Sequence, residues 1–419
     1  MADASSQFTG PTQFGAALTE LEQPTVAGGG GSTSAWYVWV FMGKKERANK
    51  SILDEFSVDL MINIFIRLPV KTLLKFRRVS KFWCNIIDDP LFTHMHHDFG
   101  EVQQKTLLLG ALDWPATTAL RDSDTEEAMV IDAAKVPMAM FEPGCAFGSC
   151  NGLMYFTRNF SDNIVVSNPL RSQFTILPPL PTETCYCKDS DSAIGLGFDS
   201  ATKTFKMVTS YKTRLSAYCT LVHTLGTTSW REVSGVPAAY CCDSDEKSVF
   251  VHGFLHWMTK PLRIQDCEGR ILAFDVSKEI FKVIPSPEIN YEKHSEIERL
   301  LRILDINGNL AMLDLSVWNT IDIRVMDYET QLWCKEYTID ITIVGRIYNV
   351  STQVVGHCNQ DEILFSFVNK DYSGSIVSYW SYSMKTGDLN KWGDVWGSHP
   401  RVYSLKGTLI SIPGAVEVS

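Results

Sequence analysis

Five segments between residues 165 and 392 repeat one order of features: a β-type run, a turn rich in Asn, Asp and Ser, an aromatic residue and an aliphatic run. Successive aromatic residues in this alignment are 56, 51, 52 and 59 positions apart, and they are Phe174, Trp230, Phe281, Trp333 and Trp392. A repeat of about 50 residues is the length of one four-stranded blade of a kelch-type β-propeller. The pattern therefore predicts an all-β domain over residues 104–415, a kelch-like β-propeller of about six blades. A plain β-sandwich with regular hairpins is the alternative, although it gives no reason for such a period.

A second cue is a glycine placed one or two residues before a leucine. It occurs at Asn151-Gly152, His252-Gly253 and Asn307-Gly308. Glycine readily adopts the backbone conformations of tight turns, so we expect each pair to open a strand. We also expect residues 402–412 to pair with a strand from residues 104–135, because closing the ring in this way removes an open sheet edge.

Residues 51–99 have a different character and predict a compact unit of three short helices. Ser57 is a good N-cap, Asp59 follows in the first turn, and the apolar residues Leu60, Ile64 and Leu68 then recur every four positions until Pro69. A second helix has an apolar face spaced by three and four residues: Leu73, Phe76, Val79, Trp83 and Ile87. A helical unit of about 45 residues is only marginally stable, so it is expected to depend on a partner.

The second predicted helix is also basic. It carries Lys71, Lys75, Arg77, Arg78 and Lys81, with no acidic residue between positions 70 and 87. A basic surface beside an apolar face fits an acidic protein partner. The alternative is a solvated basic face with the apolar face buried in the core.

Composition limits the compartment and the partners. The chain has 419 residues, a formal net charge of −10 and 11 cysteines. The acidity disfavours nucleic acid as a partner, and an odd number of scattered cysteines favours reduced thiols in a cytoplasmic and/or nuclear protein. Residues 1–50 are expected to be a disordered tail. The apolar run Ala35–Met42 in it is far shorter than the roughly 20 residues of a membrane span, so no membrane partner is expected. It remains open whether that run is an interfacial anchor, a stray strand, a docking segment or a gene-model artefact.

Motifs for catalysis and for metal binding are missing from the sequence. It has no Gly-x-Ser-x-Gly, phosphate-binding Gly-rich or His-Glu-x-x-His pattern. The close cysteine pairs lack Cys-x-x-Cys spacing, so neither a metal nor a cofactor is expected. His94, His96 and His97 are interpreted as surface histidines.

Residues 56–97 resemble the F-box. The resemblance rests on Arg67-Leu68-Pro69-Val70-Lys71, on Phe76-Arg77-x-Val79-Ser80-Lys81-x-Trp83 and on Pro90-x-Phe92. The chain departs from the family at the start, where Phe56-Ser57 stands in place of the usual Leu-Pro.

Residues 145–412 are similar to the F-box-associated domain of plant F-box proteins. The matching phrases include Gly148-Ser149-Cys150-Asn151-Gly152-Leu153, Ser167-Asn168-Pro169, Ser229-Trp230-Arg231 and Val251-His252-Gly253-x-Leu255-His256-Trp257. Each phrase is weak alone, and their order along the chain carries the resemblance.

The resemblance implies a non-enzymatic substrate-recognition subunit of a Skp–cullin–F-box E3 ubiquitin ligase. The F-box would bind a Skp-family adaptor and thereby a cullin–RING ligase, while the β domain would hold a protein substrate. The family positions expected to pack the F-box or to meet the adaptor are Leu60, Ile64, Leu68, Pro69, Val79 and Trp83. The alternatives are a kelch-type protein-binding scaffold without ubiquitination and a propeller enzyme.

Two acidic runs in polar segments are candidates for the substrate surface. They contain Asp189 and Asp191, and Asp243 and Asp245. If the two runs share one rim of the propeller, they would attract a basic partner, with an attraction that weakens as salt increases. Solvated loops without a partner are the other interpretation.

Overall fold

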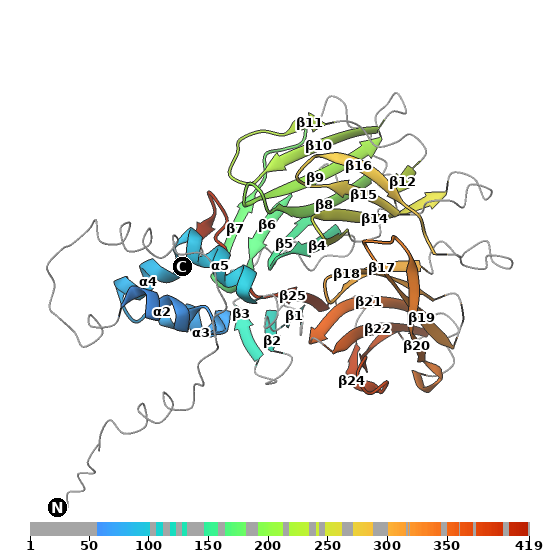
Figure 1. The fold of residues 1–419 in the computed structure, drawn as a ribbon. Coiled ribbons are helices and arrows are strands. Elements are labelled where there is room, and N and C mark those ends of the chain that lie inside the picture. The colour runs from blue at the N-terminus through green and yellow to red at the C-terminus, as the bar shows by residue number, and fades with distance from the viewer. Residues whose placement is uncertain are drawn as a thin grey trace, which may run out of the picture. The chain divides into compact units, whose positions relative to one another are not determined.

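The computed structural model describes most of the chain after residue 56, and it divides into two units, Met1–Asn63 and Ile64–Ser419. The described residues are 57–100, 106–111, 118–122, 128–131, 146–157, 164–181, 192–212, 218–233, 240–242, 248–261, 271–287, 301–315, 317, 319–344, 350–359, 361–371, 374–396 and 402–417. Short helices come first along the chain and strands follow (Figure 1). The four residues Asp189, Asp191, Asp243 and Asp245 and the run 35–42 lie outside the described ranges.

Within residues 57–100, four short helices precede the strands. They are α2 (Val58–Phe65), α3 (Val70–Phe76), α4 (Lys81–Ile87) and α5 (Pro90–Gly100). Ser57 caps α2 as predicted, since its Oγ accepts the N–H of Leu60 at 3.2 Å. The second predicted helix is instead two helices, because Ser80 begins a new one. The Ser80 backbone is extended and its Oγ accepts the N–H of Trp83 at 3.1 Å, which is N-cap geometry.

The strands that the structure describes form six antiparallel sheets. The first is β25 (Val402–Lys406), β1 (Thr106–Ala111), β2 (Thr118–Asp122) and β3 (Ala128–Ile131). The second is β4 (Ala146–Cys150), β5 (Leu153–Thr157), β6 (Val165–Asn168), β7 (Gln173–Ile176) and β26 (Val416–Glu417). The third is β8 (Ser192–Asp199), β9 (Thr204–Lys212), β10 (Tyr218–Thr224) and β11 (Arg231–Val233).

The remaining three sheets follow in chain order. The fourth is β12 (Tyr240–Cys242), β13 (Val249–Val251), β14 (Phe254–Pro261), β15 (Ile271–Asp275) and β16 (Ile280–Ile284). The fifth is β17 (Leu301–Ile306), β18 (Asn309–Asp314), β19 (Thr320–Met326) and β20 (Trp333–Asp340). The sixth is β21 (Val350–Asn359), β22 (Glu362–Asp371), β23 (Gly374–Ser383) and β24 (Leu389–Trp396).

Neighbouring sheets meet through their inner strands, as in a propeller. β4 contacts β8, β8 contacts β13, β13 contacts β17, β17 contacts β21, and β21 contacts β25. β25 pairs with β1 from Thr106↔Lys406 to Gly110↔Val402, and the chain then crosses to the second sheet, where β26 pairs with β7. The propeller of about six blades and its closure by the C-terminal strand are therefore confirmed, and the β-sandwich alternative is wrong.

Two kinds of turn repeat from blade to blade. Asn151-Gly152, His252-Gly253 and Asn307-Gly308 each join the first two strands of a blade, with both residues at φ between 48° and 83°. Type I′ hairpin turns require positive φ at both central positions, which explains the Asn-Gly pairs. In the second, fourth and fifth sheets, an Asx turn begins the connection to the last strand of the blade, at Asn168, Asp275 and Asp327. In the fourth sheet, for example, Asp275 Oδ1 accepts the N–H groups of Ser277 and Lys278.

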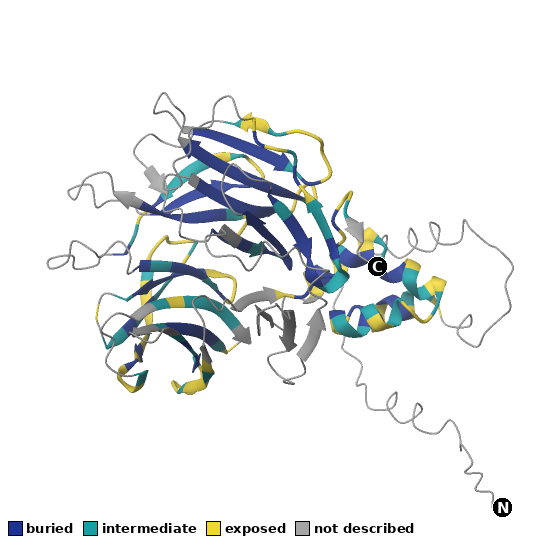
Figure 2. Cartoon of the chain, turned by 180° about the vertical axis from the view of Figure 1, so that it is seen from behind, coloured by how far each residue is buried: buried dark blue, intermediate teal, exposed yellow. Residues whose placement is uncertain are grey.

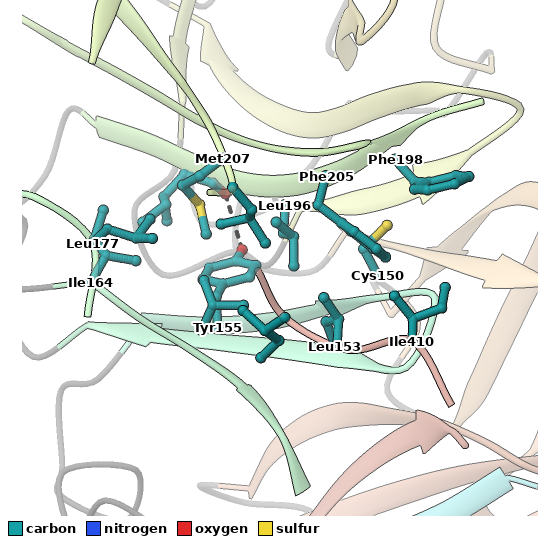
Figure 3. Close-up of a cluster of buried hydrophobic side chains, with 14 residues drawn as sticks. Cys150, Leu153, Tyr155, Ile164, Leu177, Leu196, Phe198, Phe205, Met207 and Ile410 are labelled. Carbon is teal, nitrogen blue, oxygen red and sulfur yellow. Dashed lines mark hydrogen bonds between the residues drawn. The ribbon is translucent and has the colours of Figure 1, made fainter. Parts of the chain in front are cut away.

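The core lies between blades. Figure 3 shows the cluster between the second and third sheets, where Leu153, Leu196 and Met207 pack at 0–1% exposure. Tyr155 Oη in this cluster donates to the carbonyl of Ile194 at 3.1 Å. Similar clusters fill the spaces between the third and fourth, fourth and fifth, and fifth and sixth sheets. Buried residues accordingly dominate these strands, whereas the helices carry buried, intermediate and exposed residues side by side (Figure 2).

Candidate functional site

The helices expose several large apolar side chains. Leu60 and Ile64, one turn apart on α2, are 46% and 43% exposed. Val79 before α4 is 58% exposed, and Phe82 in its first turn is also exposed. Helix α5 exposes three more at a spacing of four residues: Leu91, Met95 and Phe99. These exposed apolar side chains are candidates for contact with a partner.

The six residues predicted for the F-box separate into two groups. Leu60, Ile64, Pro69 and Val79 are exposed and Leu68 is half-buried. Trp83 instead packs against the rings of Phe65 and Phe76, with centroids 5.2 and 5.0 Å away. The first group is therefore accessible to a partner, whereas Trp83 stabilises the helices.

Four exposed apolar residues were missed by sequence reasoning: Phe82, Leu91, Met95 and Phe99. The last three are spaced by four residues, which places them on one face of a helix. This spacing is present in the sequence, but spacing alone does not show which face of a helix is buried.

The basic residues of α3 and α4 do not all face solvent. Lys75, Arg78 and Lys81 are exposed. Arg77 is half-buried, and its Nε donates to both carboxylate oxygens of Asp88 at 2.9 and 2.8 Å. The predicted basic surface is therefore smaller than the sequence pattern indicates.

The interpretation of His96 and His97 as surface residues is wrong, since each is 4% exposed. His96 Nε2 lies 2.8 Å from the carbonyl oxygen of Leu68, and the His97 ring packs 6.2 Å from that of Phe198. Burial lowers the pKa of His97 to about 4. Helix α5 buries these histidines on the side opposite to Leu91 and Met95. The residue types alone do not show which face of the helix is buried.

The two rims of the propeller differ. In the blades whose connections the structure describes, short turns lie on one rim, here called the short-turn rim, and they include residues 151–152, 169–172 and 200–203. Two residues of this rim pair with the helical region: Arg171 with Asp88 and Lys203 with Asp98. The connections from one blade to the next leave from the opposite rim.

The predicted acidic segments flank described strands in different ways. Asp189 and Asp191 fall between β7 and β8, whose facing ends lie at the opposite rim. Asp243 and Asp245 fall between β12 and β13, two strands that pair with the same strand β14. A common acidic surface therefore stays a prediction.

Strongly perturbed titratable groups in the propeller join neighbouring blades. Lys206 Nζ, 8% exposed in its side chain, lies 2.9 Å from both Asp199 and Glu279. Burial disfavours ionised Asp199, but hydrogen bonds from Ser277 and Lys206 hold the pKa of this carboxyl well below its usual value. Because the charges are compensated within the cluster, we interpret it as structural.

A buried histidine makes the next junction. His256 Nδ1 lies 3.1 Å from the carbonyl oxygen of Val249, and its Nε2 is hydrogen-bonded to the hydroxyl of Tyr328 in the fifth sheet. Burial lowers the pKa of His256 to about 3, so the ring is neutral at pH 7. Both ring nitrogens are occupied, which leaves no free base for catalysis at this position.

The described part of the chain also shows two absences. No cluster of three or more His, Cys, Asp or Glu side chains within it could hold a metal ion. None of its helices has the length and apolar character needed to cross a membrane.

Comparison with known proteins identifies two domains. The F-box domain model matches residues 53–95, and the model of the F-box associated beta propeller domain matches residues 112–391. A putative F-box/kelch-repeat protein of Arabidopsis thaliana is 25% identical over 303 residues, covering 68% of this chain and 71% of that protein. The Arabidopsis F-box protein CPR1 is 25% identical over 309 residues, covering 67% of this chain and 72% of its own length.

Proposed function

Since this chain belongs to the F-box proteins that carry an F-box-associated β-propeller domain, we propose that it is the substrate-recognition subunit of a Skp–cullin–F-box ubiquitin ligase. The observation that carries the proposal is the set of exposed apolar side chains on the helices, above all Val79 at 58% exposure. A cytoplasmic and/or nuclear Skp-family adaptor would cover them, which offsets the cost of leaving apolar surface in water.

In this role the chain performs no bond chemistry. It holds a substrate near the ligase and so raises the local concentration of substrate lysines. The opposite rim is free of the pairs that Arg171 and Lys203 make with Asp88 and Asp98, and it is the rim we propose for the substrate. Blade-to-blade connections leave from it, and such loops commonly carry recognition.

Adaptor binding is tested with purified full-length protein and a recombinant Skp-family adaptor. Val79→Asp places a charge on the proposed interface and is expected to abolish co-purification, because a buried unpaired carboxylate is strongly unfavourable. Ile343→Asp is the matched control, since Ile343 is 66% exposed on the propeller. Failure of the unchanged protein to bind the adaptor, or equal binding by both variants, contradicts the proposal and favours a scaffold without ubiquitination.

The acidic segments are tested separately, by replacing Asp189, Asp191, Asp243 and Asp245 with Asn. We expect weaker capture of a basic substrate and a smaller effect of salt on that capture, while adaptor binding is retained. Substrate capture with unchanged salt dependence shows that these residues are not the site.

A further inference from the structure

Arg171 joins three segments that are far apart in the sequence. It lies at the short-turn rim, between β6 and β7, and its side chain is only 4% exposed. Its Nη2 donates to Asp88 Oδ1 at 2.9 Å, at the C-terminal end of α4. Its Nη1 donates to the carbonyl oxygen of Leu409 at 2.8 Å, in the chain that follows β25. One guanidinium therefore contacts both the helical region and the segment that closes the propeller.

The closing segment 407–412 is held to the second sheet by two further side chains. Asn168 Nδ2 donates to the carbonyl oxygens of Thr408 and Ile410 at 3.2 and 2.8 Å. Asn168 Oδ1 accepts the N–H groups of Leu170 and Arg171, which fixes the turn that carries Arg171. Gln173 Oε1 accepts hydrogen bonds from Ser411 and Ile412. The position of Arg171 is thus set by the same turn that holds the closing segment.

The Arg171–Asp88 contact pairs a buried positive charge with a carboxylate, so losing either residue is costly. A buried guanidinium needs a carboxylate, and removing one member of a buried pair leaves an uncompensated charge. Burial alone would raise the pKa of Asp88, but hydrogen bonds from Arg77 and the charge of Arg171 lower it, so the carboxyl is ionised at neutral pH. A second pair between the helices and this rim, Lys203 with Asp98, spans 3.5 Å with side chains 45% and 60% exposed, and such pairs contribute little.

We propose that Arg171 is a positioning residue that couples closure of the propeller to docking of helices α4 and α5, so that the two form and open together. When the closing segment leaves, Arg171 loses the Leu409 carbonyl and its supporting turn loosens. When the helices leave, Arg171 loses the carboxylate of Asp88 and becomes exposed to water, which competes for its bond to Leu409 and weakens the turn that holds the closing segment. An effect of this coupling on ubiquitin transfer rests on the proposed function. The coupling between propeller closure and helix docking does not depend on that function.

Hydrogen exchange of the full-length protein, followed by mass spectrometry, tests the coupling without adaptor or substrate. The informative variant is Asp88→Asn, because Asp88 has no contact with the closing segment among the hydrogen bonds and ion pairs of the described residues, and Asn preserves its shape. We expect exchange to rise about tenfold or more both in residues 81–99 and in residues 406–412. Arg171→Met is expected to give the same pair of changes.

Lys203→Met is the matched control, since it removes the exposed pair at the same rim and is expected to leave both segments unchanged. Asp88→Asn with faster exchange in the helices but unchanged exchange in residues 406–412 overturns the proposal, because it shows a local contact only. Unchanged exchange in both segments overturns it as well. If Arg171→Met fails to fold, Asp88→Asn alone still decides between these outcomes.

Discussion

At the scale of single residues, Trp230 and Trp333 make the same contact in different blades. Trp230 Nε1 donates to the carbonyl oxygen of Pro178 at 2.7 Å, and Trp333 Nε1 donates to that of Pro285 at 2.8 Å. Trp230 lies just before β11 and Trp333 begins β20, and each proline follows the strand from which the chain leaves the preceding blade, β7 or β16. The indole therefore ties adjacent blades together at their outer edges.

Trp230→Phe tests this contact. Phenylalanine keeps most of the apolar packing but cannot donate to Pro178, so the free energy of unfolding is expected to fall by about 1 kcal/mol. Trp392→Phe is the control, because Trp392 is 39% exposed and a surface change of this kind stays within about 0.5 kcal/mol. Urea denaturation compares the two variants, and an equal effect would show that the hydrogen bond is unimportant.

The lowered pKa of His97 is expected to make the stability of the protein depend on pH. This pKa is lowered by burial to about 4, with Asp98 opposing the shift and Lys406, His94 and His96 adding to it. The unfolded residue titrates near 6.5, so between about pH 6.5 and 4 the unfolded state binds more protons, and stability falls as pH decreases. This residue can contribute up to about 3 kcal/mol of that loss.

Denaturation at pH 7.5 and pH 5 measures the effect. His97→Gln has no group to titrate at this position and should lose less stability over the interval than the unchanged protein. Equal losses in both proteins would assign the pH dependence to other groups.

At the scale of secondary-structure elements, Ser80 decides how the helices are arranged. It caps a new helix, α4, inside the second predicted helix, which leaves Val79 in solvent and turns Trp83 toward Phe65 and Phe76. Residues only four positions apart thus have different surroundings, since Val79 is exposed and Trp83 packs against two aromatic rings.

Trp83→Ala and Val79→Ala separate packing from partner binding. Trp83→Ala removes a large packed side chain and is expected to lower helix stability by roughly 3 kcal/mol, with loss of adaptor binding as a consequence. Val79→Ala is expected to weaken adaptor binding with little change in stability. Circular dichroism and adaptor co-purification give the two readouts. Full adaptor binding by Trp83→Ala contradicts the assignment of this residue to the core.

Local patterns explain which elements were predictable from the sequence. The Asn-Gly pairs reflect the geometry of a two-residue turn, and the aromatic residues spaced by about 50 positions reflect the length of one blade. Both patterns are set within a single blade and can be read from the sequence. The break at Ser80 was missed because the spacing of apolar residues continues across it. No sequence pattern predicts the contact between Arg171 and Asp88, because it depends on how segments 83 positions apart pack together. Burial of His96 and His97 was missed for the same reason.

At the scale of the whole molecule, the first blade is built from both ends of the propeller sequence. β25 supplies its inner strand and β1, β2 and β3 supply the others. Closure therefore depends on the last part of the chain, through β25 and through the bonds that Asn168 and Gln173 make to residues 408–412.

Two truncations test the closure. A chain ending at residue 401 loses β25 and leaves an unpaired edge at β1, so it is expected to aggregate on size-exclusion chromatography. A chain ending at Pro413 loses β26 but keeps β25 and the closing segment, and it is expected to elute as the full-length protein does. Normal elution and unfolding temperature of the shorter chain would show that ring closure is dispensable.

The shared first blade also sets a delay during synthesis on the ribosome. About 290 residues separate the end of β1 at Ala111 from the start of β25 at Val402. At about 5–20 residues per second, the inner edge of β1 waits roughly 15–60 s for its partner strand. During that interval the nascent chain presents the backbone of Thr106–Ala111, with three consecutive leucines, as an open strand edge. The newly made chain, rather than the finished propeller, is therefore the form most in need of a chaperone.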